Sequence, residues 1–254
     1  MSLATTAHAR HVSTSQGEVE LPIRYWDVST AAAVFRVPAE PAAELTAHLG
    51  VTPVRIGDHA LAGLVFYEYR RTSVGVYNEV GLTVVGAPPH VPRWRLPADP
   101  LRAVRRRDVG WAVLDLPVTT ERANAAGREI WGYPKFVTDI PIRFAPHAFH
   151  GQVRDPDGDG EILTLEGALG SGAPGPRLDV LTYTRHEGET WRTVVDVRGR
   201  FRIHRGRTLQ LRVGDSSHGM AQRLRALGLD EASPTALLVT HEWRSLLHAG
   251  APLR

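Results

Sequence analysis

The residues with the clearest chemical potential lie around a single lysine. The chain has 30 basic side chains, of which Lys135 is the one lysine and the rest are arginine. Arginine stays protonated, whereas lysine can lose its proton and act as an amine nucleophile. Trp131, Tyr133 and Phe136 place aromatic surface beside Lys135 in the sequence. An apolar pocket disfavours the ammonium form and lowers the pKa of a lysine, so this spacing predicts an amine that can attack a ketone carbonyl.

The product of that attack would be an iminium. An iminium is an electron sink, because it stabilises the negative charge left by lost CO2 or by an abstracted proton. The alternative for the same residues is an amphipathic lysine whose stem lies on the aromatic rings while its head reaches water. Pro134 stiffens the approach and makes Tyr133 extended, so we expect Lys135 to begin a strand that runs to Phe144.

Other spacings match known motifs, but their surroundings do not fit. Asp155–Glu166 has the spacing of an EF-hand calcium loop, yet strand-like segments flank it where helices are required, which favours a hairpin turn. Gly170–Gly175 has the glycine spacing of a dinucleotide loop but no helix follows it, so we expect a hairpin loop there too. We therefore expect no cofactor and no metal. A basic run could touch phosphate, but without aromatic platforms it favours a solvated face or an oligomer contact: Arg102, Arg105, Arg106 and Arg107.

The lysine segment resembles a known catalytic motif. Gly127–Lys135 reads Gly-Arg-Glu-Ile-Trp-Gly-Tyr-Pro-Lys and resembles the Schiff-base lysine motif of acetoacetate decarboxylase and its superfamily. Val76–Gly81 resembles the Tyr-x-Glu-x-Gly strand of that family, which carries an active-site glutamate. Ala33–Arg36 and Thr208–Leu211 resemble further family segments, so the resemblance covers nearly the whole chain.

The resemblance implies a fold and a set of roles. The implied fold is a strand-rich α+β, cone-like β-barrel with a few peripheral helices, an interior pocket and a homo-oligomeric state. Lys135 would form the Schiff base, and Glu79 would point into the cavity to orient substrate or move protons. Arg24 is the candidate for the carboxylate-binding arginine of the family, with an ordinary edge-strand arginine as the alternative. The implied substrate pocket includes Leu64, Glu68, Trp131, Tyr133 and Phe136.

Two positions depart from the family pattern. Phe136 stands where true decarboxylases have a second lysine, so like-charge assistance to Lys135 is absent and desolvation alone must tune the amine. Leu64 stands where the family has a second glutamate, and Glu68, on the same strand and face, is its candidate replacement. Both departures argue against acetoacetate as the substrate and favour aldol, dehydration or other carbonyl chemistry.

The elements that must position these residues are mostly strands. Period-2 alternation, as in Leu64, Phe66 and Glu68, predicts half-buried strands along most of the chain. Three helices are expected, at Pro41–Leu49, Thr119–Glu129 and His218–Leu227, with caps at Thr119 or Thr120 and at Asp215 or Ser216. We expect a single domain over 17–254, a loosely ordered segment over 1–16, and a long surface loop from Pro88 to Pro100.

Composition restricts the class of protein further. The chain has 254 residues, 43% hydrophobic residues, no cysteine and a formal net charge of +3, which excludes disulfides, thiolate metal sites and cysteine nucleophiles. The first residues lack the apolar region of a secretory leader, so we expect none, and the longest apolar run is too short to span a membrane. We therefore expect a soluble cytoplasmic protein that binds neither nucleic acid nor membrane.

Three functions remain open from the sequence. The first is a lyase that forms a Schiff base between Lys135 and a small keto acid, for decarboxylation of a β-keto acid or for aldol and dehydration chemistry. The second is a pocket enzyme that cyclises or isomerises a larger polyketide-like or terpenoid substrate without an iminium. The third is a non-catalytic barrel that binds a small molecule.

Overall fold

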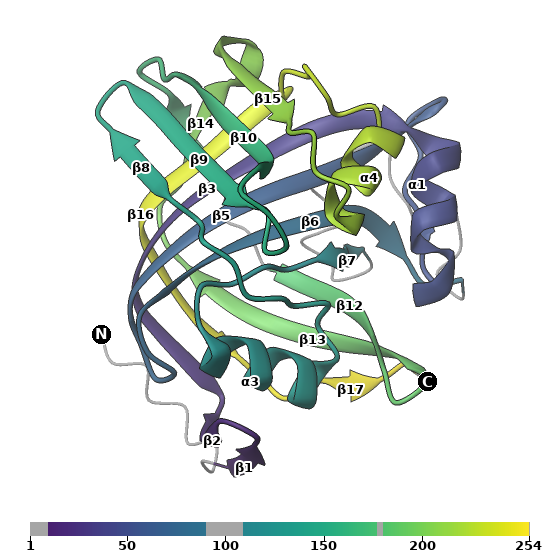
Figure 1. The fold of residues 1–254 in the computed structure, drawn as a ribbon, viewed down its shortest axis with the longest axis vertical. Helices are drawn as coiled ribbons and strands as arrows, with labels where there is room; N and C mark the ends of the chain where they lie inside the picture. The colour runs from purple at the N-terminus through teal and green to yellow at the C-terminus, as the bar shows by residue number, and fades with distance from the viewer. Residues whose placement is uncertain (1–9, 90–108, 177–179, 254) are drawn as a thin grey trace.

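A closed barrel forms the centre of the protein (Figure 1). The structure, a computed structural model, describes residues 10–89, 109–176 and 180–253. Neighbouring barrel strands are antiparallel except β7 and β12, which are parallel, and β13 pairs with β16 to close the ring. The predicted strand-rich barrel with a few peripheral helices is confirmed. Its seven strands are β3 (Ile23–Pro38), β5 (His59–Thr72), β6 (Tyr77–Ala87), β7 (Gly110–Asp115), β12 (Val180–His186), β13 (Glu189–Arg198) and β16 (Ala236–Leu247).

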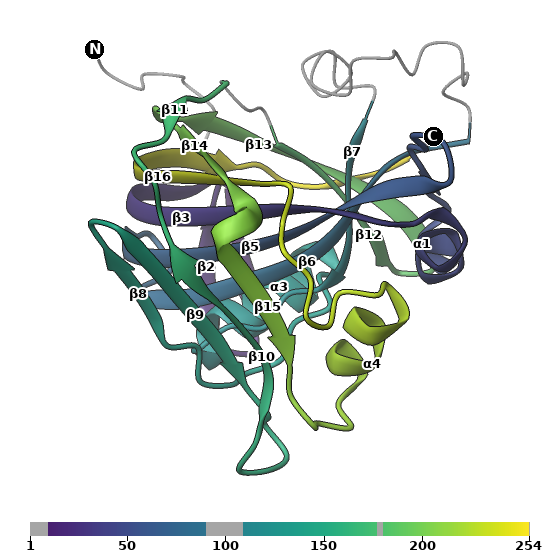
Figure 2. The ribbon, with the colours of Figure 1, turned by 90° about the horizontal axis from the view of Figure 1, so that it is seen from above.

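A second sheet packs against the outside of the barrel (Figure 2). The Phe66 ring, on the outer face of β5, contacts Phe149 of this sheet edge to face at 5.3 Å between ring centroids. Both faces of the barrel wall are therefore buried here, one against the second sheet and one against the interior. The second sheet contains β8 (Ile142–Ala145), β9 (Ala148–Arg154), β10 (Glu161–Ala168) and β15 (Leu209–Val213).

The helices match the predicted positions, with differences at their ends. Thr120 caps α3, since its hydroxyl accepts a hydrogen bond from the Ala123 amide at 3.4 Å. The predicted caps of the last helix, Asp215 or Ser216, are wrong. His218 caps it instead, because its Nδ1 accepts from the Met220 amide at 3.2 Å. The helices are α1 (Ala39–Thr46), α3 (Glu121–Trp131) and α4 (Gly219–Ala226), with short 3-10 turns η1 (Ala47–Leu49) and η3 (Gly206–Thr208).

The N-terminal region is more regular than expected. Arg10–Thr14 forms β1, which pairs with β2 (Gly17–Leu21), so the expectation of a loose segment is wrong for residues 10–16. The Ser15 hydroxyl and amide both donate to the Glu129 carboxylate, which fixes this hairpin to α3. Residues 1–9, the basic run at 102–107 and most of the proline-rich loop lie outside the described residues. The remaining short strands are β4 (Thr52–Pro53), β11 (Ala173–Pro174), β14 (Arg202–Arg205) and β17 (Ala251–Pro252).

The two segments with motif-like spacing connect strands. Residues 155–160 connect β9 and β10 as a hairpin, as predicted, with the Asp155 amide donating to the Gly160 carbonyl at 3.1 Å. Residues 169–172 lead from β10 to β11 without a helix. The hairpin expected there is wrong, because β10 pairs with β9 and β15 whereas β11 pairs with β14.

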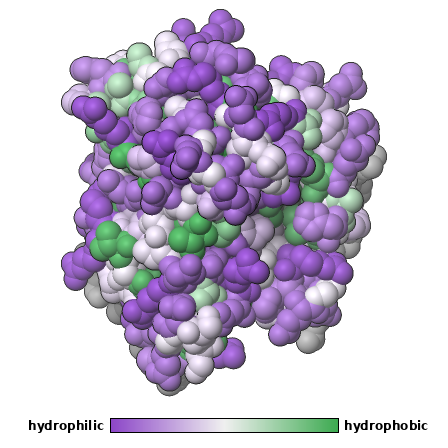
Figure 3. Space-filling view, viewed as in Figure 1, coloured by the Kyte–Doolittle hydropathy of each residue, from purple (hydrophilic) through white to green (hydrophobic). Residues whose placement is uncertain are grey.

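The face in Figure 3 is mainly hydrophilic with small, scattered apolar areas. Among the helices of the described segments, none has the length and apolarity needed to cross a bilayer.

Candidate active site

Helix α3 and the segment after it carry Lys135 to the barrel interior. The helix ends at Gly132, whose φ of +65° reverses the chain, and a Cβ there would lie 2.3 Å from the Arg185 carbonyl oxygen. Residues 134–138 then run beside 116–118, since the Leu116 amide donates to the Pro134 carbonyl at 3.0 Å and the Val118 amide to the Phe136 carbonyl at 2.9 Å.

The predicted strand from Lys135 to Phe144 is wrong over most of its length. A single bridge between Val118 and Val137 interrupts otherwise irregular backbone, and a strand begins only at Ile142. The physical reason is that Pro134 and Pro141 have no amide hydrogen for a ladder. The Arg128 guanidinium instead donates to the Lys135 carbonyl at 3.0 Å and holds this segment against α3.

Gly127 makes room for the lysine stem. A Cβ at this helical position would lie 2.1 Å from Lys135 Cε and 2.4 Å from its Cδ. No side chain larger than hydrogen therefore fits between α3 and Lys135 without moving one of them. The glycine of the sequence motif acts here as a slot for the lysine side chain.

Lys135 and Glu79 form a buried ion pair inside the barrel. Lys135 Nζ donates to Glu79 Oε2, and the two residues are only 6% and 7% exposed. Glu79 lies on β6, and its other oxygen accepts a hydrogen bond from the Tyr69 hydroxyl at 3.2 Å. The predicted inward orientation of Glu79 agrees with this geometry. Whether the proton lies on the amine or on the carboxylate, the pair stays neutral overall, which limits the desolvation penalty of burying it.

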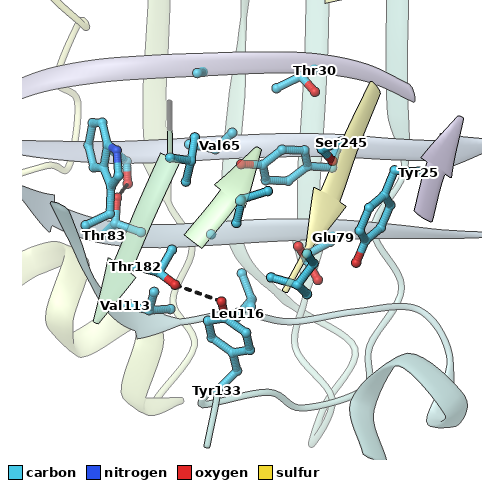
Figure 4. A pocket seen from close by; sticks show the side chains of 18 of the residues that line it. Tyr25, Thr30, Val65, Glu79, Thr83, Val113, Leu116, Tyr133, Thr182 and Ser245 are labelled. Carbon is cyan, nitrogen blue, oxygen red and sulfur yellow. Dashed lines mark hydrogen bonds between the residues drawn. The ribbon is translucent and has the colours of Figure 1, made fainter. Parts of the chain in front are cut away.

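Both members of the pair line a cavity of about 230 Å³. Figure 4 shows part of its wall, with Glu79 among the labelled side chains. The wall contains inward-facing residues of all seven barrel strands together with one face of α3, where Ala123, Ala126 and Gly127 lie. The wall is mostly apolar, with hydroxyl groups at a few positions that include Thr30, Thr83, Thr182 and Ser245. Such a lining is typical of a small-molecule site.

Tyrosines form a cluster around the ion pair. Five of the chain's six tyrosines line the cavity, and the Lys135 ammonium lies 5.9 Å from the Tyr77 ring centroid and 6.0 Å from that of Tyr133. Burial raises the pKa values of Tyr25, Tyr69 and Tyr77, and the negative charge of Glu79 raises them further. These phenols therefore stay protonated and act as hydrogen-bond donors at neutral pH. The lining tyrosines are Tyr25, Tyr67, Tyr69, Tyr77 and Tyr133.

Trp131 and Tyr133 line the cavity, as predicted for substrate-binding residues. The Trp131 indole donates to the His248 carbonyl at 2.9 Å, and the Tyr133 and Thr182 hydroxyls lie 2.8 Å apart. Both rings are thus held rigidly beside Lys135.

The other predicted substrate-binding residues do not line the cavity, and their assignment is corrected. Successive residues of a strand point to opposite faces, and inward-facing neighbours flank three of the four, namely Arg24, Leu64 and Glu68. Phe136 follows the inward-facing Lys135 directly. Arg24 pairs with Glu20 at 2.7 Å, and Glu68 pairs with Arg70 at 2.6 Å, both outside the barrel. Leu64 is buried against the second sheet. The Phe136 ring packs on His218 at 4.4 Å.

Apart from Tyr133, the tyrosine cluster is the part of the site that the sequence did not lead us to predict. Tyr67 and Tyr69 are two residues apart on β5, and Tyr77 and Glu79 are two residues apart on β6. This period-2 spacing places all four on one face, so it could have identified the inward face of both strands.

The arrangement can perform carbonyl chemistry. It combines an amine, a carboxylate in contact with it to exchange protons, and neutral phenols to donate hydrogen bonds, all in a mostly apolar cavity. Comparison with solved structures shows the same fold in enzymes of low sequence identity. An acetoacetate decarboxylase from Legionella pneumophila is 13% identical with a TM-score of 0.66, over 99% of this chain and 93% of that one.

Two further solved structures are similar in fold. An acetoacetate decarboxylase-like enzyme from Sphingomonas wittichii is 12% identical with a TM-score of 0.63, over 93% of this chain and 94% of that one. The enduracididine biosynthesis enzyme MppR, bound to the condensation product of pyruvate and imidazole 4-carboxaldehyde, is 12% identical with a TM-score of 0.65, over 92% and 90%. A comparison with curated protein sequences gives no match. The family model for acetoacetate decarboxylase, however, matches residues 10–212, most of the chain, and the protein is therefore a member of the acetoacetate decarboxylase family.

Proposed function

We propose that the protein is a lyase that forms an iminium between Lys135 and a carbonyl substrate, for aldol and dehydration chemistry or for decarboxylation of a β-keto acid. The observation that carries the proposal is the buried contact between the chain's single lysine and Glu79 inside an apolar cavity. The MppR structure supports the aldol-type alternative, because that relative holds a condensation product of a keto acid and an aldehyde.

The residues suggest how the reaction would proceed. Glu79 takes a proton from the Lys135 ammonium, and the amine then adds to the carbonyl carbon to give a carbinolamine. Glu79 returns the proton to the departing hydroxyl, so that water leaves and the iminium forms beside the carboxylate. The same carboxylate can then remove a proton from the carbon next to the iminium, which gives an enamine able to attack an aldehyde.

Borohydride reduction tests the proposal. Protein incubated with pyruvate, acetoacetate or an aldehyde is reduced, digested and analysed by mass spectrometry. We expect a reduced adduct on Lys135 and its absence in Lys135→Met. The N-terminal amine is the one other primary amine, so it serves as an internal control for unspecific labelling. Labelling of the N-terminus without labelling of Lys135, for every carbonyl compound, would contradict iminium formation.

A further inference from the structure

The charges in the cavity are already matched. Among the described residues that line it, Lys135 and Glu79 carry the formal charges, and no arginine or histidine is present. The iminium would keep the positive charge of Lys135, so Glu79 would still balance it. A substrate carboxylate would therefore add an unmatched negative charge near Glu79 in a buried space. Both the lost hydration and the like-charge repulsion oppose this.

Four of the five tyrosine hydroxyls around the ion pair already have partners. Tyr69 donates to Glu79, the Tyr25 and Tyr77 hydroxyls lie 3.4 Å apart, and Tyr133 is paired with Thr182. A carboxylate placed beside Lys135 could gain a hydrogen bond from any of these four tyrosines only by breaking a bond that the tyrosine already makes. An uncharged carbonyl compound requires no such exchange.

Thr30 is different from the other threonines and the serine of the wall, whose hydroxyls all have hydrogen-bond partners. It lines the cavity, is fully buried, and its hydroxyl has no hydrogen-bond partner (Figure 4). Thr30 pairs in register with Tyr67, and Tyr67 pairs with Glu79, so the three residues form a row across β3, β5 and β6. Two strand spacings separate the ends of this row, about 10 Å. The unpartnered hydroxyl is thus placed to bind the far end of a molecule whose carbonyl lies at Lys135.

The size and lining of the cavity suit a ring compound. An apolar protein cavity of about 150 Å³ holds benzene, and this one is larger, at about 230 Å³. Tyr67 lies in the middle of the row, and its ring contacts Tyr69 and Trp243 at centroid distances of 5.4 and 5.5 Å. Aromatic walls of this kind stabilise an aromatic ligand by stacking and edge contacts.

We propose that the substrate is an uncharged aldehyde or ketone with an apolar, ring-sized body, rather than a keto acid, and that Thr30 hydrogen-bonds a polar group at its far end. This inference rests on the proposed function, because Lys135 is taken as the site of the carbonyl. It selects aldol-type chemistry, since an uncharged substrate has no carboxylate to lose as CO2.

Two ligands of matched skeleton test the charge. Benzylacetone and benzylpyruvate differ in that a methyl group of the first is a carboxylate in the second. We expect calorimetry on the wild-type protein to give a Kd about tenfold or more lower for benzylacetone. Equal or tighter binding of benzylpyruvate, or no binding of benzylacetone, would overturn the inference. These Kd values need no covalent step, so they are independent of borohydride trapping. A failure to trap either compound on Lys135 would refute the proposed function instead.

A second pair of ligands tests Thr30. We expect para-hydroxybenzylacetone to bind the wild-type protein about two- to tenfold more tightly than benzylacetone, as one added hydrogen bond allows. In Thr30→Val, which preserves shape and removes the hydroxyl, this preference should disappear. The matched control is Thr83→Val, because the Thr83 hydroxyl also lies in the wall but donates to the Gly63 carbonyl at 3.2 Å. Thr83→Val should retain the preference. Retention of the preference in Thr30→Val would exclude Thr30 as the anchor.

Discussion

Gly127→Ala tests whether the helix determines the position of the amine. The added Cβ would lie 2.1 Å from Lys135 Cε, whereas ordinary contacts begin near 3.4 Å, so the lysine stem must move by about 1.3 Å. A misplacement of about 1 Å in an active site can reduce the rate about 100-fold, or about 3 kcal/mol of activation free energy. We therefore expect borohydride trapping at Lys135 to slow by about two orders of magnitude.

The same substitution should leave the protein folded. Alanine favours a helix over glycine by up to about 1 kcal/mol, and the lysine stem is flexible enough to move aside. Gly219→Ala is the matched control, because it adds the same methyl group to α4, where the nearest atoms belong to the flexible Arg223 side chain at 3.2 Å. The assay is the time course of adduct formation by intact-protein mass spectrometry, with denaturant unfolding alongside. A wild-type trapping rate in Gly127→Ala, or equal slowing in Gly219→Ala, would refute the reasoning.

Three further outcomes are expected. Glu79→Gln keeps a hydrogen-bond acceptor for Tyr69 but cannot exchange protons with Lys135. Borohydride trapping should therefore slow by about 10²–10⁴-fold. An unchanged trapping rate would exclude Glu79 as the base. Arg24→Ala removes an arginine that pairs with Glu20 outside the cavity. The trapping rate should therefore stay within about twofold of wild type, and the free energy of unfolding within about 1 kcal/mol. A large loss of keto acid binding would show that Arg24 belongs to the binding site after all. The five cavity tyrosines (Tyr25, Tyr67, Tyr69, Tyr77 and Tyr133) all have raised pKa values, because burial disfavours the phenolate. Their contribution to stability is therefore complete below about pH 10, where unfolded tyrosine ionises, and above it stability should fall by about 7 kcal/mol per pH unit. Tyrosinate absorbance should therefore appear together with loss of circular dichroism, and gradual ionisation of the folded protein would contradict this.

The lysine and its partner could be predicted from the sequence, but the inward face of the strands could not. Lys135 was identified because it is the single lysine and lies in a specific motif, and Glu79 was placed by resemblance. Leu64 and Glu68 were misplaced because both faces of β5 are buried along its centre: Val65 faces the cavity and Phe66 faces the second sheet. Hydrophobic alternation separates the two faces of such a strand without showing which one encloses the cavity.

The helices were predicted well because their signals are local. Thr120 and Gly132 mark the ends of α3 through a cap and a left-handed residue, and both act within a few residues. The conformation of the segment that carries Lys135 depends on contacts distant in sequence. Its backbone bonds to residues 116–118, a pairing that depends on the chain folding back after α3. The aromatic residues and the β-propensity up to Phe144 predicted a strand and did not indicate this pairing with residues 116–118.

The odd number of strands in the barrel bears on which part of the chain carries Lys135. A ring of strands that alternate in direction closes only with an even number, so a ring of seven requires a parallel neighbour, which is the pair β7 and β12. A parallel pair cannot be joined by a tight turn, and the chain must make a long crossover between the two strands. That crossover contains α3, Lys135 and the strands β8 to β10. Lys135 therefore lies in the crossover that joins the two parallel strands, whereas Glu79 and Thr30 lie on strands of the barrel. Changes in the crossover could reposition the nucleophile while the wall that holds the substrate keeps its register.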